Sequence, residues 1–272
     1  MEFERQMYKG RPFFTQLFVA RSYKLCKYVE NTIGIRDGSK LTTFSDLRDN
    51  LENELPKYES IRDDFAYSSE KQIDFFRFKK QFFDYGTEEI DPLIVWTNIR
   101  SFIKGSMEAL GNENGFMSEE QYMALGRKRC RFSDEQRTEI YKIFQKYQEF
   151  MDFSQCWDDN DRLIALLRRL KFARATNPDM FLDTFNSWIQ FDKIYVDEVQ
   201  DYTQVECLLF FELGGAGNLF LAGDPAQNVA RGVEFRFEDI RSVGYHVAGD
   251  DEGKKNLVPQ VSLILFMVTL IE

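Results

Sequence analysis

The sequence is poor in residues that bind transition metals or form disulfide bonds. Its 272 residues include one histidine and four cysteines, and the cysteines are scattered, with no Cys-x-x-Cys pair. Zinc sites and disulfide frameworks need several such residues at short, regular spacings. The composition therefore excludes a zinc module and a disulfide-rich secreted domain, and it favours a reducing intracellular compartment, nuclear or cytoplasmic.

Targeting and membrane signals are also missing. The first five residues, MEFER, are charged and have no apolar core, so no signal peptide is visible. The most apolar stretch, residues 262–272, follows a proline and is too short to span a bilayer. We expect no membrane partner and interpret this stretch as a divergent or truncated end.

The charge balance is acidic. The chain has 45 Asp and Glu against 35 Lys and Arg, a net charge of −10. Such a charge argues against nucleic-acid binding by the surface as a whole. It does not exclude a local basic channel that binds nucleic acid. Aromatic residues make up 15% of the chain, which indicates a packed core, and the length is sufficient for two domains.

Two apolar runs within residues 191–236 each end in an acidic cluster. Residues 193–201 read KIYV and then DEVQD, and residues 218–227 read NLFLA and then GDPAQ. Short β-branched and aromatic runs without alternation are typical of strands buried on both faces of a parallel sheet. We therefore predict two parallel strands here.

The segment between these strands has the length of a crossover helix. Residues 202–213 are predicted to be helical, with Asp201 as the N-cap and Gln204 three residues later. Gly214 and Gly215 supply the stop. Strand, helix and strand in this order form a βαβ unit.

The acidic residues fall where such a sheet binds ligands. In open α/β sheets, ligands bind beyond the carboxyl ends of the strands, the predicted position of Asp197, Glu198 and Asp224. An aspartate there can hold Mg²⁺ through its water shell, and an adjacent glutamate can deprotonate a water. This chemistry suits phosphoryl transfer. The alternative is a solvated acidic turn after an edge strand.

Residues 197–201 (DEVQD) resemble motif II, the Walker B motif, of superfamily 1 helicases of the UvrD/Rep type. Residues 223–227 (GDPAQ) resemble motif III of the same family, in the right order after one helix. The resemblance implies an α/β fold of the P-loop NTPase, RecA-like class, with an incomplete parallel sheet and a large helical insertion. It also implies ATP and Mg²⁺ as cofactors, and single-stranded nucleic acid, DNA rather than RNA, as the partner.

The resemblance also assigns roles to the acidic residues. Asp197 is the expected Mg²⁺ ligand and Glu198 the expected base for the attacking water. Asp224 and Asp201 are expected to bind the cofactor. Three residues are expected to couple the γ-phosphate to the nucleic-acid site: Gln200, Asp224 and Gln227.

Two further stretches suggest nucleic-acid contacts. Residues 13–20 read as a strand that ends at Arg21 and Ser22, which resembles motif Ia, a turn that grips the phosphate backbone. Phe235 and Arg236 lie in the aromatic and basic stretch after motif III, where a base can stack on the ring. The alternatives are a helix cap for Ser22 and core packing for Phe235.

The phosphate-binding loop of the family, G-x-x-x-x-G-K-[ST], has no counterpart in this sequence. The nearest string, residues 249–255, is too short, acidic and without the Ser or Thr, and we reject it. We therefore expect a helicase fragment that is inactive alone and lacks the second RecA-like domain. The predicted parts are residues 1–40 and 191–247 for the core, 41–190 for the helical insertion, and 248–272 for an apolar tail.

The middle of the chain reads as helical. Residues 93–106 resemble a "W-x-E-I…IKGS" element of a eukaryotic branch of large, repeat-containing UvrD-like proteins. Ser118 with Gln121, and Ser133 with Gln136, predict two capping boxes. Basic residues also gather in this part of the chain, and they form either a nucleic-acid-binding face or ordinary solvated helix faces. They are Arg127, Lys128, Arg129, Arg131, Arg137, Lys142, Lys146, Arg168, Arg169, Lys171 and Arg174.

A competing interpretation is a non-catalytic scaffold that binds nucleic acid or protein, in which the acidic motifs are vestigial. Nucleotide binding separates this class from the motor class. A metal-dependent nuclease is a weaker third interpretation, because the sequence has no further acid–lysine signature.

Overall fold

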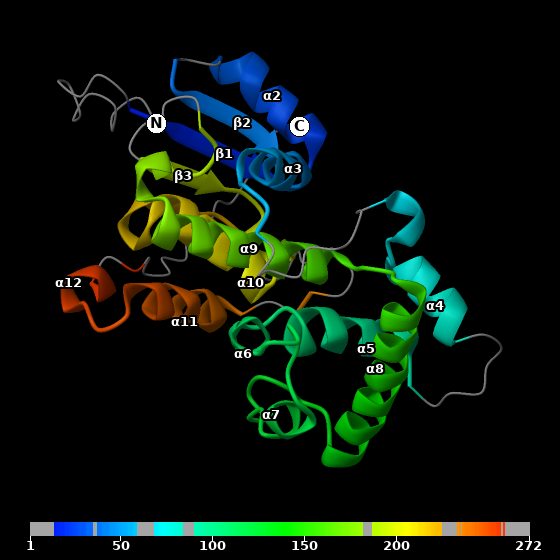
Figure 1. Ribbon diagram of the computed structural model, residues 1–272. Coiled ribbons are helices and arrows are strands. Elements are labelled where there is room, and N and C mark those ends of the chain that lie inside the picture. Colours follow the sequence, from blue (N-terminus) through cyan, green and yellow to red (C-terminus); the bar gives the residue numbers. More distant parts are fainter. Residues whose placement is uncertain are drawn as a thin grey trace, which may run out of the picture.

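The computed structural model describes residues 14–34, 37–58, 68–83, 90–181, 187–224, 233–234, 236–256 and 258. Within this part of the chain, four parallel strands form one sheet in the order β2-β1-β3-β4 (Figure 1). Helices flank the sheet, and further helices form a separate group. The predicted α/β class, a parallel sheet with inserted helices, is confirmed.

The strands are short, and their carboxyl ends lie level with one another. They are β1 (Gln16–Ala20), β2 (Ser39–Thr43), β3 (Lys193–Val196) and β4 (Leu219–Leu221). Val19 pairs with Val196, which in turn pairs with Leu221. The segments that follow β1, β3 and β4 therefore start at the same edge of the sheet.

The sheet packs with four helices into one apolar core. These helices are α3 (Phe44–Glu54), α9 (Asp159–Thr176), α10 (Gln204–Gly214) and α11 (Phe237–Ala248). Helix α2 (Tyr23–Ile33) lies outside this core and contacts β1 and β2. The ring of Phe44 in α3 contacts Phe210 in α10 at 5.7 Å between centroids. The crossover from β3 through α10 to β4 is thus part of the core.

The crossover helix begins later than predicted. Its N-cap is Thr203, whose side chain forms a capping box with Glu206. The prediction of Asp201 as the N-cap is wrong, because Val199–Asp201 forms a separate 3₁₀ turn. At the other end Gly215 caps the helix with φ 72°, a conformation that glycine adopts without strain, so the predicted glycine stop is confirmed.

A second apolar core holds the middle of the chain together. It joins α4 (Phe75–Phe82), α5 (Pro92–Asn98), the π-helical turn Ile99–Ile103, α7 (Glu119–Met123) and α8 (Asp134–Ser154), with α6 (Met107–Gly111) beside them. Phe78, Trp96 and Tyr147 form its aromatic centre. We call residues 73–156 the helical lobe, which lies at the lower right of Figure 1.

The helical lobe is smaller than the predicted insertion at 41–190. Most of strand β2 falls inside that range, yet β2 belongs to the sheet. Helices α3 and α9 also fall inside it, yet they pack in the core of the sheet. Leu47, Leu166 and Leu170 are buried in the same core as Leu17 of β1. Of the predicted apolar tail, residues 248–272, the structure describes 248–256 and 258. These residues include the end of α11, the short helix α12 (Glu252–Lys255) and Val258, which is buried in the core of the sheet. The apolar run 262–272 lies outside the described residues.

Local signals in the helical lobe were informative. Both predicted capping boxes are present, at the starts of α7 and α8.

None of the helices in the described ranges is long and apolar enough to cross a membrane.

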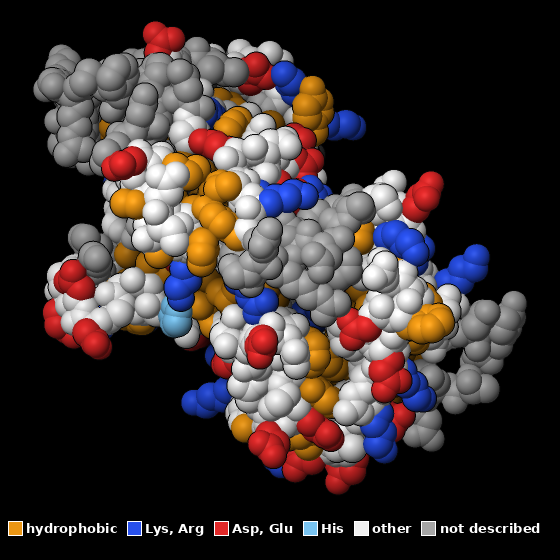
Figure 2. Space-filling view, viewed as in Figure 1, with side chains coloured by type: hydrophobic (Ala, Val, Ile, Leu, Met, Phe, Trp, Pro, Cys, Tyr) orange, Lys and Arg blue, Asp and Glu red, His pale blue; other side chains and the backbone are white. Residues whose placement is uncertain are grey.

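The basic residues do not form one exposed face. Arg137 and Arg169 are buried and donate to backbone carbonyls, for example the carbonyl of Cys130 at 2.5 Å and the carbonyl of Glu52 at 2.8 Å. Figure 2 shows acidic and basic side chains interspersed over the lobe. The predicted nucleic-acid face on these residues is therefore interrupted by structural arginines.

The IKGS element joins the helical lobe to the sheet. Lys104 is fully buried and pairs with Asp158 and Asp161 at the start of α9, each at 2.6 Å. Burial alone would lower the pKa of Lys104, but the attraction of both carboxylates outweighs it and the net shift is upward. The Gly105 carbonyl accepts from the Val205 N–H at 3.1 Å, which docks the lobe on the start of α10.

We predict that Lys104→Met lowers the free energy of unfolding by about 3–5 kcal/mol at pH 7, because two carboxylates are left buried without their cation. The control is Lys142→Met, since Lys142 is 60% exposed and pairs with Glu139 on the surface. Its expected cost is below about 1 kcal/mol. Urea denaturation measures both values, and equal losses would contradict a lobe held by this cation.

Candidate catalytic edge of the sheet

Three carboxylates follow the carboxyl ends of β3 and β4, the two strands that α10 connects. Asp197 directly follows β3, and its N–H donates to the carbonyl of Val19 in β1 at 3.0 Å. Asp224 is the third residue after β4, and Ala222 on the way to it donates to Val196 at 2.8 Å. We call Asp197, Glu198 and Asp224 the carboxylate edge. Both acidic clusters are brought together by the parallel pairing of β3 with β4.

The turn after β3 is tightly constrained. The Val199 N–H donates to the Ala222 carbonyl at 2.8 Å, so the turn is bonded to the end of β4. Glu198 has φ 53° and ψ 47°, a left-handed conformation that is uncommon for residues other than glycine. Such outliers persist where the surroundings enforce them, often at functional sites. The Glu198 side chain is exposed, and Asp197 is half-buried.

Gln200 connects the two acidic clusters directly. Its side chain is fully buried, its Oε1 accepts from the Asp224 N–H at 3.0 Å, and its Nε2 donates to a carboxylate oxygen of Glu198. One amide therefore orients the Glu198 carboxylate and fixes the backbone at Asp224. A buried amide has few other ways to satisfy both of its polar ends.

Gly223 leaves room for this bridge. A Cβ at this position would lie 2.4 Å from Gln200 Oε1 and 2.7 Å from Val199 Cγ1. Both distances are shorter than real Cβ contacts allow, so a larger residue would displace the amide. The glycine is thus required by the close approach of the two turns.

The donor set suits a Mg²⁺ ion that is carried by phosphate. Mg²⁺ usually binds one or two protein carboxylates together with phosphate oxygens and water. Asp197 offers one half-buried carboxylate at the strand end. Among the described residues, no group of three or more His, Cys, Asp or Glu side chains is arranged to hold a metal by itself. The edge therefore fits a shared ion better than a resident structural metal.

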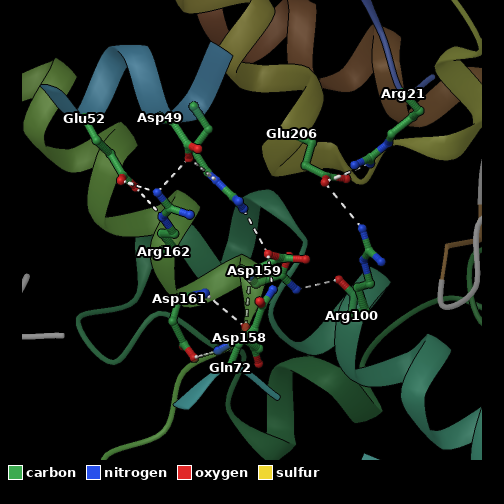
Figure 3. A network of polar contacts seen from close by, with 12 residues as sticks. Arg21, Asp49, Glu52, Gln72, Arg100, Asp158, Asp159, Asp161, Arg162 and Glu206 are labelled. Carbon is green, nitrogen blue, oxygen red and sulfur yellow. Dashed lines mark hydrogen bonds and ion pairs between the residues drawn. The ribbon is translucent and has the colours of Figure 1, made fainter. Parts of the chain in front are cut away.

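Arg21 and Ser22 follow β1 at the same edge. The Ser22 hydroxyl accepts from the Leu25 N–H at 3.3 Å and caps α2, the structural alternative for this residue. Arg21 donates to Glu206 Oε1 at 2.8 Å (Figure 3). It also donates to the Asp201 carbonyl at 2.8 Å. Much of the guanidinium is thus used inside the protein, although 30% of the side chain is exposed.

Asp201 and Arg236 have structural contacts of their own. Asp201 is buried, and its N–H donates to the Glu198 carbonyl at 2.9 Å. Arg236 precedes α11 and donates to the carbonyl of Lys128 in the helical lobe at 2.7 Å. The other two predicted site residues, Gln227 and Phe235, lie outside the described residues.

Two residues that form ion pairs beside Arg21, Glu206 of α10 and Arg100 of the helical lobe, were not found from the sequence. Glu206 is 3% exposed and accepts from Arg21 at 2.8 Å and from Arg100 of the helical lobe at 3.4 Å. Burial alone would raise the pKa of Glu206, but the two guanidinium groups outweigh it and the net shift is downward. The Thr203–Glu206 capping pattern is visible in the sequence, whereas the contact with Arg100 is not.

The comparisons with known proteins agree with this geometry. The family model "UvrD/REP helicase N-terminal domain" matches residues 18–236, more than half of the chain. The chain therefore belongs to the UvrD/REP helicase family. It is also similar to human "TPR and ankyrin repeat-containing protein 1", at 38% identity over 164 residues. That match covers 60% of this chain and 5% of the relative, so the chain spans a small part of the relative's length.

We predict that Gly223→Ala lowers the free energy of unfolding by about 1–3 kcal/mol, because the new methyl group overpacks the Gln200 bridge. Gly126→Ala is the matched control, since nothing lies within 4 Å of its added Cβ. The control is expected to change stability by less than about 1 kcal/mol. Urea titrations measure the free energy of unfolding of both variants. Equal values would contradict the claim that the close approach at Gly223 contributes to stability.

Proposed function

We propose that this chain is part of an ATP-dependent helicase and that the carboxylate edge is its ATP-hydrolysis site. The observation that carries the proposal is the Gln200 bridge, which joins Glu198 to the backbone of Asp224. Acidic turns that were merely solvated would not need a buried amide between them. UvrD/REP helicases as a family use ATP and Mg²⁺, and the family match supports the same cofactors here.

Each residue of the edge has a role in this proposal. Asp197 would hold the Mg²⁺ ion, which supplies positive charge to the phosphate oxygens when it is bound. Glu198 orients the attacking water and accepts its proton, because its exposed carboxylate faces solvent at the sheet edge. Gln200 keeps that carboxylate in place through its Nε2 donor. Asp224 and Gln227 complete the proposed contacts with the nucleotide.

The nucleic-acid partner is proposed to be a single strand, DNA rather than RNA. Arg21 supports this because it lies at the same edge, is partly exposed, and contacts the turn that follows Glu198. Through Asp201, a strand bound near Arg21 would influence the catalytic turn. Ser22, Phe235 and Arg236 remain proposed contacts along the same strand.

The surroundings of this motor are also proposed. Similarity to a human protein that is named for its TPR and ankyrin repeats supports membership of the eukaryotic, repeat-containing UvrD-like branch. A second helicase domain outside this chain is part of the same proposal. The four cysteines are buried free thiols, which supports an intracellular location. A scaffold with vestigial motifs is the competing function, and its proposed basic face is interrupted where Arg137 and Arg169 are buried.

Nucleotide binding tests the proposal. Mg²⁺-ATP at ten times its Kd is expected to stabilise the chain by about 1.4 kcal/mol and to raise Tm by about 3 °C, and Asp197→Asn is expected to abolish the shift. Asp250→Asn, which removes an exposed carboxylate after α11, is the control and keeps the shift.

Phosphate release by the same samples is expected to stay at background, with or without single-stranded DNA, because the phosphate-binding loop is absent from the sequence. The absence of any Mg²⁺-ATP shift in the unsubstituted chain would favour the scaffold. DNA-stimulated turnover that Glu198→Gln abolishes would disprove the expected inactivity while supporting the assigned base.

A further inference from the structure

A pocket lies between the sheet and the helical lobe, apart from the carboxylate edge. Its volume is about 390 Å³, which falls within the range of small-molecule sites, roughly 300–1,000 Å³. Asp197, Glu198 and Asp224 are not among its lining residues. The residues that the argument uses are Phe75, Phe76, Trp96, Arg21, Arg100 and Asp159.

One wall of the pocket is aromatic. Phe75 stands between Phe76 and Trp96, at ring-centroid distances of 5.8 and 6.5 Å. Phe76 is 65% exposed although it is a large apolar side chain at the start of α4. An exposed ring on a pocket wall offers a stacking surface for another flat group.

The lining of the pocket also includes two guanidinium groups in fixed positions. Arg21 and Arg100 approach the same oxygen of Glu206, at 2.8 and 3.4 Å, from β1 and from the helical lobe (Figure 3). Arg21 is further fixed by the ring of Tyr202, 4.1 Å from its guanidinium carbon. These side chains therefore present hydrogen-bond donors with little freedom to move.

A carboxylate beside the arginines offers an acceptor. The Asp159 side chain is 41% exposed, and its bonds from Arg48 and Gln72 both reach Oδ1. Within the described residues, Oδ2 of Asp159 has no bonding partner. Asp158 differs, because Lys104 and Tyr147 already occupy its Oδ2.

The mixture of positive and negative side chains in the pocket limits which class of ligand can bind there. A phosphate or other anion would meet the carboxylates of Asp159 and Asp201, and a cation would meet the two guanidinium groups. A flat, uncharged ring with both donors and acceptors can stack on the aromatic wall and bond to the polar side chains of the lining. Nucleobases are rings of this kind, and their stacking on aromatic side chains does not depend on the base.

We propose that this pocket binds a nucleobase, stacked on Phe76 and hydrogen-bonded by Arg100 and Asp159. Two sources carry this chemistry: a base of a single strand, or a free nucleoside or nucleotide whose phosphates stay outside. Binding of a base from a single strand, which we call the strand source, rests on the proposed function. Binding of a free nucleoside or nucleotide, which we call the free source, does not. Arg21 then links an occupied pocket to the turn after Glu198 through the Asp201 carbonyl.

The test compares Phe76→Ala with Phe153→Ala, which removes a ring that is 92% exposed on α8 and does not line the pocket. Calorimetry measures binding of adenosine, cytidine and uridine, which carry no phosphate. Fluorescence anisotropy measures binding of a labelled 12-nucleotide strand and of the same strand with abasic sites. If Phe76→Ala lowers Tm, Phe76→Leu replaces it, because it keeps apolar volume and removes the ring.

Loss of the ring is expected to weaken base-dependent binding about 5- to 150-fold, the usual effect of one stacking contact, and Phe153→Ala is expected to leave it unchanged. Nucleoside binding that depends on Phe76 supports the free source. A preference for the intact strand over the abasic strand that depends on Phe76 supports the strand source.

Two results would overturn the pocket assignment. One is base-dependent binding that Phe76→Ala leaves unchanged. The other is a chain that binds no nucleoside and binds intact and abasic strands equally, which would leave the proposed helicase function standing. A chain that binds nucleosides through Phe76 but no strand would keep the pocket and remove the nucleic-acid partner from the proposed function.

Discussion

The structure depends on one buried carboxylate that joins three parts of the chain. Glu206 accepts from Arg21 at the end of β1 and from Arg100 of the helical lobe, and its other oxygen accepts from the Thr203 N–H at the start of α10. A carboxylate removed from water costs several kcal/mol unless charged partners compensate it. Two guanidinium groups do so here, which requires the sheet, the crossover helix and the lobe to meet at one point.

The same point positions the turn after β3 and the pocket. From Glu206 the connection runs through Arg21 to the Asp201 carbonyl, and from the Asp201 N–H to the Glu198 carbonyl. Gln200 then extends it to Asp224, so both acidic turns are fixed relative to the lobe. The pocket shares Arg21 and Asp201 with this chain of contacts. A ligand in the pocket and a nucleotide at the edge would therefore act on one connected set of hydrogen bonds.

Local patterns predicted much of this arrangement, and long-range contacts account for what they missed. Strand β3, the crossover helix and both serine capping boxes follow from residues within a few positions of one another. The N-cap at Asp201 was wrong because the turn after Glu198 takes three residues before the helix begins. The pairing of Arg100 with Glu206, 106 residues apart, leaves no signal in either local sequence. The lobe boundary was missed for a similar reason, since α3 and α9 meet only in the folded core.

The most direct test of the account is the free energy of unfolding as a function of pH for the unsubstituted chain and for Glu206→Gln. The pKa of Glu206 is depressed in the folded chain, so its charge stabilises the fold above about pH 4.5, its ordinary pKa, and this contribution is lost as the pH falls through the folded value. At pH 7 the variant is predicted to be less stable by about 3–5 kcal/mol, because two guanidinium groups lose their buried partner. Below pH 4.5 the difference is predicted to shrink progressively. A difference that is absent at pH 7, or that has the same size at pH 7 and pH 3, would contradict the central role of the Glu206 charge.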